Sequence, residues 1–270
     1  MNLRKIRRIF KNLLLKFNLL FTKPTNKEEL QNLINKLHPI KTNHNLIRIG
    51  GDYDGGYLIP NDLVGIDSLF SPGVSNIANF EKEMLEKIDG LNCYLADYSV
   101  DSSPINHPNI NFEKKFLGAT NNDIFFTLEE FIKKKSVSKK DYMLQMDIEG
   151  YEYEVLINTR DEVMNKFRII VIEFHNLHKL IEESSFIFFK AAFTNILQTH
   201  EVVHIHPNNT LNHLSVSYKG ITIPSVMEFT FLRKDRIKSK SKIFGFPHPL
   251  DMPCTKKRED FRLPDEWWKI

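Results

Sequence analysis

The stretch Tyr142-Met-Leu-Gln-Met-Asp147-Ile-Glu149-Gly150-Tyr-Glu-Tyr-Glu-Val-Leu156 joins an apolar run to a group of carboxylates, with one glycine between them. The residues before Asp147 are typical of a buried strand in a parallel sheet. Gly150 permits a tight turn into a helix over 151–156. Ligands of open α/β sheets bind outside the carboxyl ends of the strands, so we expect Asp147 and Glu149 to point into a crevice. The alternative is that both acids only occupy the first turn of the following helix, whose dipole favours negative charge.

Similar strand-like runs recur along the chain and alternate with helical patterns. Capping boxes at Thr25–Glu28 and Thr127–Glu130 open two of the expected helices. The alternation predicts an α/β fold with a doubly wound sheet that ends in an antiparallel hairpin. The seven expected strands lie at 66–70, 91–97, 109–112, 142–147, 167–176, 201–209 and 226–233.

Composition excludes several classes of protein. With 37 basic and 34 acidic side chains in 270 residues, the net charge of +3 is too small to indicate general nucleic-acid binding. Cys93 and Cys254 are the two cysteines, so we do not expect a disulfide framework. We expect a reducing compartment instead. No run reaches the roughly 18–20 apolar residues of a membrane-spanning helix. We therefore expect a cytoplasmic protein.

The amino terminus is basic and amphipathic. Residues 1–21 interleave apolar side chains with lysine and arginine and contain no acid. Such a helix can lie on the anionic inner face of a membrane. It can equally dock on the domain or on a second copy of the chain, which would make a homo-oligomer. A signal peptide is disfavoured, because charges persist to Lys16 and no small-residue cleavage site precedes Pro24.

The chain divides into four parts. We expect the basic helix over 1–23, a helical cap with a glycine-rich loop over 24–65, the main domain over 66–235, and a tail packed on the domain over 236–270. The loop carries Asp52 and Asp54, an Asp-x-Asp pair that in other proteins holds a divalent ion on a sugar nucleotide. A plain β-turn explains the same residues.

The first strand and its turn have the features of a nucleotide-binding half. Ser71-Pro-Gly73-Val-Ser75-Asn76 separates the strand from a helix, but it lacks the Gly-x-Gly-x-x-Gly spacing, so diphosphate binding is disfavoured. Asp97 ends the second strand, 24 positions beyond Gly73, close to the offset at which an acid meets ribose hydroxyls. The alternative for Asp97 is a cap on the next turn.

The fifth strand ends much as the fourth does. Glu173, His175 and Asn176 follow its apolar run, so two adjacent strands deliver acids and a histidine to one edge of the sheet. His204 and His206 share one face of the sixth strand, and at least one of them is expected to be a buried, hydrogen-bonded histidine.

Four motifs together resemble the FkbM-type branch of S-adenosylmethionine-dependent methyltransferases. They are Gly50-Gly-x-x-Asp54-Gly-Gly-Tyr57, Ser-Pro-Gly73-Val-Ser, Gln-Met-Asp147-Ile-Glu149-Gly150-x-Glu-x-Glu-Val-Leu and Ile-Glu173-Phe-His175, within residues 48–233. The resemblance implies the Rossmann-like sheet of class I methyltransferases with a last antiparallel strand. It also implies methyl transfer to a hydroxyl oxygen, often on a sugar of a cell-surface glycan, glycolipid or their precursor in polysaccharide biosynthesis.

The residues at the strand ends suit that reaction. His175 is the candidate base, Glu173 either orients it or binds the acceptor, and Asp147 steers the acceptor hydroxyl. The acids Asp147 and Glu173 also correspond to a divalent-ion pair of similar sugar O-methyltransferases, which suits Mg²⁺. Those enzymes carry a histidine base three residues after the fourth-strand acid, where this chain has Gly150. Expected cofactor contacts are Ser71, Gly73, Ser75, Asn76, Asp97, Tyr98, Phe116, Leu117 and Asp147, and expected acceptor contacts are Asp54, Tyr57, Glu149, His206 and Asn208.

Two other functions remain open at this point. One is a metal-dependent glycosyltransferase built on Asp52 and Asp54. The other is a non-catalytic, membrane-associated subunit that keeps the fold.

Overall fold

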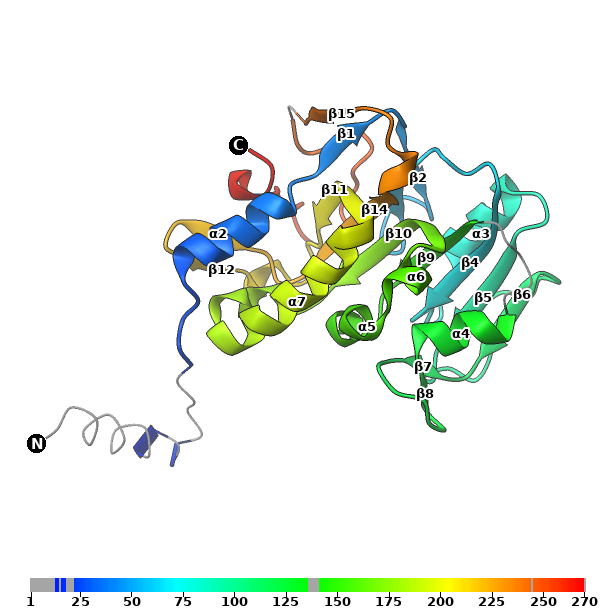
Figure 1. The fold of residues 1–270 in the computed structure, drawn as a ribbon, viewed down its shortest axis with the longest axis horizontal. Helices are drawn as coiled ribbons and strands as arrows, with labels where there is room; N and C mark the ends of the chain where they lie inside the picture. Colours follow the sequence, from blue (N-terminus) through cyan, green and yellow to red (C-terminus); the bar gives the residue numbers. More distant parts are fainter. Residues whose placement is uncertain (1–12, 15, 18–21, 136–140, 244, 270) are drawn as a thin grey trace, which may run out of the picture.

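A seven-stranded mixed sheet forms the centre of the protein (Figure 1). The computed structural model describes residues 13–14, 16–17, 22–135, 141–243 and 245–269. Strand β14 is antiparallel to both of its neighbours, whereas the other strands run parallel to one another. The Rossmann-like, doubly wound sheet with an antiparallel last strand is therefore confirmed. Its strands are β4 (Ile66–Pro72), β5 (Asn92–Ala96), β6 (Ile110–Glu113), β9 (Asp141–Met146), β10 (Phe167–Phe174), β11 (His200–Pro207) and β14 (Met227–Arg233).

The order of the strands fixes the place of the site. Across the sheet they run β11-β14-β10-β9-β4-β5-β6. The chain thus moves outward from β4 through β5 to β6, then crosses back and continues from β9 in the opposite direction. The carboxyl ends of β4 and β9 flank this switch point, which is where open α/β sheets bind ligands.

Helices cover the face of the sheet that Figure 1 looks onto. Ile170, Ile172 and Phe174 of β10 point into this core, and the ring centroid of Phe174 lies 4.7 Å from that of Phe193 and 5.4 Å from that of Tyr153. These contacts hold helix α5, and with it Glu152, against the end of β10. The helices on this face are α2 (Lys27–Lys36), α4 (Leu128–Lys135), α5 (Glu152–Asn158), α6 (Asp161–Met164) and α7 (Glu183–Thr199), and the 3-10 turn η1 (Leu177–Ile181) precedes α7.

Helix α3 (Asn79–Lys87) and a β-hairpin cover the opposite face. The hairpin pairs β2 (Leu46–Ile49) with β3 (Tyr57–Pro60), and Thr230 of the sheet donates a 2.6 Å hydrogen bond from Oγ1 to the Leu58 carbonyl. The glycine-rich stretch is the hairpin tip. A Cβ on Gly50 would lie 2.1 Å from the Gly55 carbonyl oxygen, so the tip closes only with glycine there. The sequence pattern had indicated a loop without strands.

The start of α2 also differs from the expected capping box. Asn26, not Thr25, is the N-cap, and its side chain accepts hydrogen bonds from the backbone N–H groups of Glu28 (2.8 Å) and Glu29 (3.2 Å). Thr25 is buried and its hydroxyl donates instead to the Leu180 carbonyl at 2.7 Å. Thr25, which the local sequence pattern assigns to the N-cap, thus makes a tertiary hydrogen bond instead.

The tail is tied into the fold at several points. Its strand β15 (Lys240–Lys242) pairs with β1 (Ile40–Thr42), and the buried Trp267 donates from its indole to the Thr222 carbonyl at 2.9 Å. Strands β12 (Val216–Tyr218) and β13 (Ile221–Ile223) form a separate hairpin. The remaining elements are β7 (Phe116–Leu117), β8 (Phe125–Phe126), η2 (Asn212–Leu214), η3 (Lys234–Arg236) and η4 (Asp265–Trp267).

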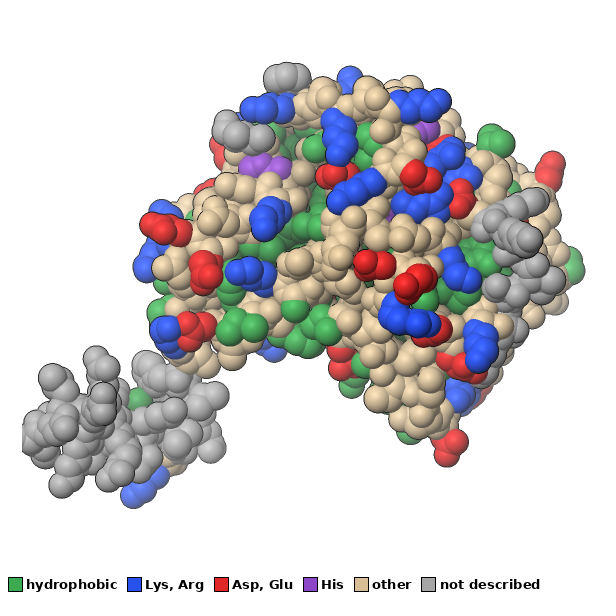
Figure 2. Space-filling view, viewed as in Figure 1, with side chains coloured by type: hydrophobic (Ala, Val, Ile, Leu, Met, Phe, Trp, Pro, Cys, Tyr) green, Lys and Arg blue, Asp and Glu red, His purple; other side chains and the backbone are tan. Residues whose placement is uncertain are grey.

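Most of the predicted basic helix over 1–21 lies outside the described residues. Within the described ranges, no helix combines the length and apolar character needed to cross a bilayer. Basic and acidic side chains are interspersed over the face seen in Figure 2.

Gly73 offers a test of the packing at the switch point. Its φ is 87°, and an added Cβ would lie 1.6 Å from the Asp147 carbonyl oxygen. We expect Gly73→Ala to lower the free energy of unfolding by about 2–5 kcal/mol, since left-handed backbone costs roughly 1–2 kcal/mol and overpacking roughly 1–3 kcal/mol.

Gly90→Ala is the matched control for urea unfolding. Gly90 also has a positive φ, 74°, but an added Cβ would meet no heavy atom within 4 Å. We expect only the backbone cost of about 1–2 kcal/mol there. Equal losses for the two variants would contradict the close contact between β4 and β9.

Candidate active site

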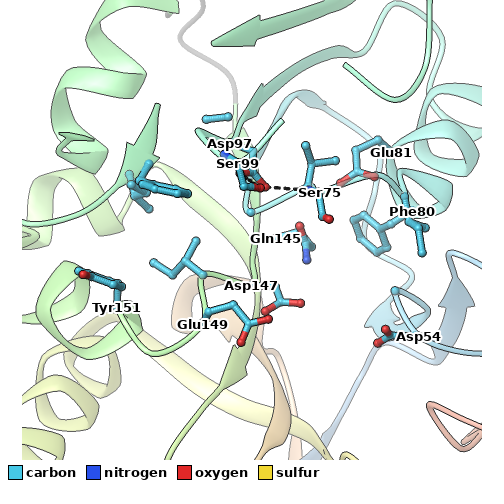
Figure 3. A pocket seen from close by; sticks show the side chains of 18 of the residues that line it. Asp54, Ser75, Phe80, Glu81, Asp97, Ser99, Gln145, Asp147, Glu149 and Tyr151 are labelled. Carbon is cyan, nitrogen blue, oxygen red and sulfur yellow. Dashed lines mark hydrogen bonds between the residues drawn. The ribbon is translucent and has the colours of Figure 1, made fainter. Parts of the chain in front are cut away.

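A cavity of about 510 Å³ opens at the carboxyl ends of β4, β5 and β9 (Figure 3). The glycine turn after β4 and Asp97 form one end, and the hairpin tip approaches from the side of Asp54. Asp147 and Glu149 stand at the other end. Of the residues predicted for the site, those lining the cavity are Asp54, Tyr57, Gly73, Ser75, Asp97, Phe116, Leu117, Asp147 and Glu149.

Asp97 holds the glycine turn in place. Its Oδ2 accepts a 2.8 Å hydrogen bond from the Ser75 N–H, and its Oδ1 accepts from the Ser99 N–H (2.8 Å) and hydroxyl (2.6 Å). A carboxylate has about four acceptor positions, so three are in use and one remains on Oδ2. Asp97 therefore caps the next turn and keeps capacity for one ligand hydroxyl.

Aromatic rings form a wall of the cavity. Phe116 of β7 and Phe125 of β8 lie 5.7 Å apart between ring centroids, and Tyr151 continues the row 5.7 Å beyond Phe125. Flat apolar faces of this kind suit a purine or a sugar ring. Phe125 was missed in the sequence, because β8 is too short to leave a periodic signal. Tyr151 lies within the Asp147 motif but was not singled out there.

A buried hydrogen-bond chain lies beneath the turn. The Ser71 hydroxyl contacts both Glu81 and the Gln145 amide oxygen (2.7 Å), and Gln145 Nε2 donates to the Tyr57 hydroxyl at 3.3 Å. A hydroxyl has one proton, so one contact of Ser71 must be donated by its partner. Burial raises the pKa of Glu81, which keeps that carboxyl protonated and able to donate. Ser71 thus supports the site from behind without lining the cavity.

Four carboxyl groups surround the imidazole of His175. Its Nδ1 lies 3.0 Å from Glu152 Oε1, and its Nε2 lies 3.4 Å from Glu149 Oε2. Nε2 is also 3.6 Å from Glu173 Oε1 and 3.8 Å from Asp147 Oδ1. The three residues predicted to act together are therefore neighbours, with Asp147 at the cavity wall and Glu173 and His175 directly behind it.

Burial and mutual charge set the protonation of this cluster. Burial raises the pKa of Asp147 to about 7, although His175 opposes the rise. Burial also lowers the pKa of His175, but the hydrogen bond and charge of Glu152, with Asp147 and Glu149, outweigh it and bring the value to about 9. Burial and the nearby negative charge of Asp147 raise the pKa of Glu173 well above its usual range. At neutral pH the imidazole is the cation that balances the carboxylates.

Backbone strain is concentrated at the same place. Ser75, Glu149 and Asn176 have φ values of 47°, 56° and 60°, in the region that side chains other than glycine seldom adopt. Such strain persists where the surrounding structure enforces it, and it clusters at functional sites.

Comparison with known proteins agrees with this geometry. Residues 76–204, which run from the glycine turn into β11, match the family model described as "Methyltransferase FkbM domain". The match supports a methyltransferase that uses S-adenosylmethionine as its methyl donor. A search of curated proteins found no match.

Three solved structures are distantly similar. A chain of a fibrillarin/Nop5p complex is 12% identical over 63% of this chain and 73% of its own, with a TM-score of 0.36. Spermidine synthase from Thermotoga maritima is 11% identical over 72% of this chain and 74% of its own, with a TM-score of 0.34. A precorrin-6y C5,15-methyltransferase from Geobacter metallireducens GS-15 is 10% identical over 79% and 95%, with a TM-score of 0.31. TM-scores this low say nothing about function.

Other residues predicted for the site lie away from the cavity wall. Asn76 is exposed, and Tyr98 packs its ring 5.4 Å from that of Phe116. Asn208 donates to Glu173 Oε1 at 3.1 Å. Of the Asp-x-Asp pair, Asp54 lines the cavity and Asp52 does not. His206 is buried, and residues of the tail cover it.

The pair Asp147 and Glu173 does not fit a resident magnesium ion. Asp147 Oδ1 and Glu173 Oε2 are buried without hydrogen-bond partners, as metal ligands would be. However, the His175 imidazole lies beside both carboxyl groups, and its pKa of about 9 already provides a positive charge there. Mg²⁺ also keeps several water molecules in its octahedral shell. Because Glu173 is buried, there is little room for these waters beside it. Asp147 and Glu173 therefore act here as carboxyl groups and not as metal ligands.

Glu152 was not singled out from the sequence, although it lies within the Asp147 motif. It is fully buried, and its Oε1 accepts from the Gly150 N–H at 2.9 Å as well as facing His175. We expect Glu152→Gln to lower the pKa of His175 from about 9 toward its ordinary 6.5, because the variant keeps the hydrogen bond from Gly150 but removes the charge. The ring-proton NMR signals of histidine, titrated with pH and assigned by a His175→Gln sample, measure this shift.

Glu154→Gln is the control on the same helix. We expect it to leave the titration of His175 unchanged. A raised folded-state pKa stabilises the fold at low pH, and the contribution disappears as the pH rises through about 9. The stability difference between Glu152→Gln and the native chain should accordingly be largest below pH 6.5 and shrink above pH 9. A His175 pKa near 6.5 in the native chain would refute this account of the cluster.

Proposed function

We propose that the protein is an S-adenosylmethionine-dependent O-methyltransferase whose acceptor is a sugar hydroxyl of a cell-surface glycan or its precursor. The observation that carries the proposal is one cavity with a nucleoside-binding end and an acid-rich end. Asp97 and the Gly73 turn mark the first, and Asp147 with its unpartnered Oδ1 marks the second. The FkbM domain supports methyl transfer, and the acid-rich end supports a hydroxyl acceptor.

The nucleoside end suits the cofactor. The free acceptor position on Asp97 Oδ2 can receive a ribose hydroxyl, and the aromatic pair Phe116 and Phe125 can flank the adenine. When bound, S-adenosylmethionine supplies an electrophilic methyl group on a positively charged sulfur. The carboxylates of Asp147, Glu149 and Asp54 favour a cation at the other end of the cavity.

The acceptor end must remove a proton. When the acceptor oxygen bonds to the methyl carbon, the hydroxyl proton has to pass to a base. Asp147, with a pKa of about 7, is half ionised near neutral pH and lines the cavity. His175, with a pKa of about 9, already carries its proton at that pH and is enclosed by carboxyl groups. We therefore assign the role of base to Asp147. His175 keeps the Asp147 carboxyl group in position.

The surroundings favour a polyhydroxylated acceptor. Asp54, Glu149 and the Tyr57 hydroxyl offer hydrogen-bond partners around the acid-rich end. Tyr151, which is 47% exposed, presents an aromatic face at the mouth of the cavity. Sugars combine hydroxyl edges with apolar ring faces, so they match both features. Glycan precursors assembled at the inner face of a membrane would also give the basic amino-terminal segment a place to bind.

Cofactor binding tests the nucleoside end. We expect titration calorimetry to detect binding of S-adenosylmethionine and of its demethylated product. Asp97→Ala should weaken both by about 10–150-fold, the equivalent of a lost hydrogen bond to a charged group of roughly 1.5–3 kcal/mol. Asp101→Ala is the control, because that carboxylate lies on the same loop but is 94% exposed and contacts Lys114. Absence of binding at millimolar cofactor would end the proposal.

Methyl transfer tests the acceptor end. We expect tritiated methyl groups to pass to carbohydrate of a cell-envelope extract from the source organism. Mild base should not release the label as methanol, and acid hydrolysis should yield an O-methylated monosaccharide. The rate should rise as the pH increases through about 7, since the base must lose its proton first. At saturating cofactor, Asp147→Asn should lower the rate by about 10²–10⁴-fold.

The outcomes separate the parts of this proposal. A flat rate between pH 6 and 8 would exclude Asp147 as the base. Label released as methanol would indicate a carboxyl acceptor, and label in protein or lipid without sugar would exclude a glycan.

A further inference from the structure

A second cluster of ionisable side chains lies buried beyond Glu173, outside the cofactor cavity. His206 of β11, Glu228 of β14 and Cys254 of the tail each offer a ligand atom, and these atoms all lie within 4.8 Å of one another. The residues are 4%, 6% and 5% exposed. The methyl-transfer scheme uses none of them.

The distances within the cluster are close to those of a metal's ligand set. Cys254 Sγ lies 3.3 Å from Glu228 Oε1, and His206 Nδ1 lies 3.8 Å from Glu228 Oε2. Zn²⁺ binds sulfur at about 2.3 Å and nitrogen or oxygen at about 2.0–2.2 Å in a tetrahedron, which places neighbouring ligand atoms roughly 3.3–3.6 Å apart. Small side-chain adjustments bring all three onto one ion.

The chemistry of the three groups selects zinc. A thiolate, an imidazole and a carboxylate are a borderline-soft donor set, which suits Zn²⁺ and does not suit Mg²⁺ or Ca²⁺. A thiolate and a carboxylate together carry two negative charges, which the ion neutralises. The Arg48 guanidinium is the nearby cation, but its hydrogen bonds go to the carbonyls of Gly51 and Tyr53.

The two ring nitrogens of His206 lie close to different carboxylates, with Nδ1 on the side of Glu228. Its Nε2 is buried without a hydrogen-bond partner and lies 3.8 Å from Asp260 Oδ1. Histidines that bind zinc through one nitrogen usually donate from the other to a carboxylate. Asp260 is placed for that role, whereas the neighbouring His204 is already paired with Asp251 at 2.8 Å.

We propose that His206, Glu228 and Cys254 bind a zinc ion that fastens the tail to the sheet. His206 coordinates through Nδ1, Asp260 orients it, and water takes the fourth position. The Cys254 carbonyl accepts a 3.1 Å hydrogen bond from the Asp54 N–H, so the ion also fixes the hairpin tip that lines the cofactor cavity.

Metal content and cobalt spectra test the site on the full chain after removal of any affinity tag. We expect about one zinc per chain after growth in zinc-supplemented medium, and a lower melting temperature after chelation. Replacement by Co²⁺ should give visible absorption bands and a thiolate-to-cobalt charge-transfer band in the near ultraviolet. Absence of both stoichiometric zinc and the thiolate band in the native chain would overturn the proposal.

The two cysteines provide matched variants. Cys93 is buried in β5 and away from the cluster, so Cys93→Ala should keep the zinc and the thiolate band. Cys254→Ala should lose the band and bind zinc at least 100-fold more weakly. A Cys254→Ala protein that binds zinc as the native chain does would refute the site. Should Cys254→Ala fail to fold, the band in Cys93→Ala decides, because Cys254 is then the sole thiol.

A second variant tests the orienting carboxylate. We expect Asp260→Asn to weaken zinc binding about 10–100-fold, and Glu259→Gln, its sequence neighbour, to leave it unchanged. Equal affinities for the two variants would show that Asp260 does not orient His206.

Discussion

The close approach of Gly73 to the Asp147 carbonyl is the contact on which the site depends. It brings the end of β4 against the end of β9 at the point where the sheet reverses its direction of growth. A side chain at position 73 would separate the two strand ends, and with them the two halves of the cavity. Because the turn lies this close, the acid that ends β9 can share a cavity of about 510 Å³ with the acid that ends β5.

A second constraint is the burial of acids in a row across the sheet. Glu173 is in register with Glu228, Glu228 is in register with His206, and Asp147 directly follows the β9 residue paired with Ile172. Each strand therefore contributes one ionisable group to the same edge. Desolvation alone would keep the carboxyl groups neutral. His175 supplies the positive charge at the cavity end of the row, and the other end, with an imidazole and a thiol, is where the proposed zinc ion would lie.

The sequence was sufficient for the sheet and for the inner part of the site. Each of the seven strands is long enough for its apolar run to be recognised, and acids at strand ends have a position that the topology fixes. Asp97, Asp147 and Glu149 could be assigned to one cavity for that reason. The identity of the methyl donor was inferred from the FkbM resemblance, because no residue spacing in the chain specifies it.

The parts that could not be predicted depend on long-range contacts. Thr25 is not the N-cap because its hydroxyl donates to the Leu180 carbonyl, and His206 lies outside the cavity because the tail covers it. Phe125 comes from a strand too short to show a period, and nothing in the motif around Asp147 distinguishes Tyr151 from its neighbours. Glu152 looked like one more acid at a helix start, and only its contact with the Nδ1 of His175 distinguishes it.

Part of the cavity wall comes from the hairpin that precedes the matched domain. The FkbM match covers residues 76–204, whereas the hairpin tip with Asp54 and the tail with Cys254 lie before and after it. Asp147, Glu149 and Tyr151 line the cavity from within the match, and Asp54 and Tyr57 line it from the hairpin. The hydrogen bond from the Asp54 N–H to the Cys254 carbonyl connects that hairpin to the tail. The acids at the strand ends thus belong to the matched domain, and differences in acceptor choice would arise first at the hairpin that closes the cavity beside them.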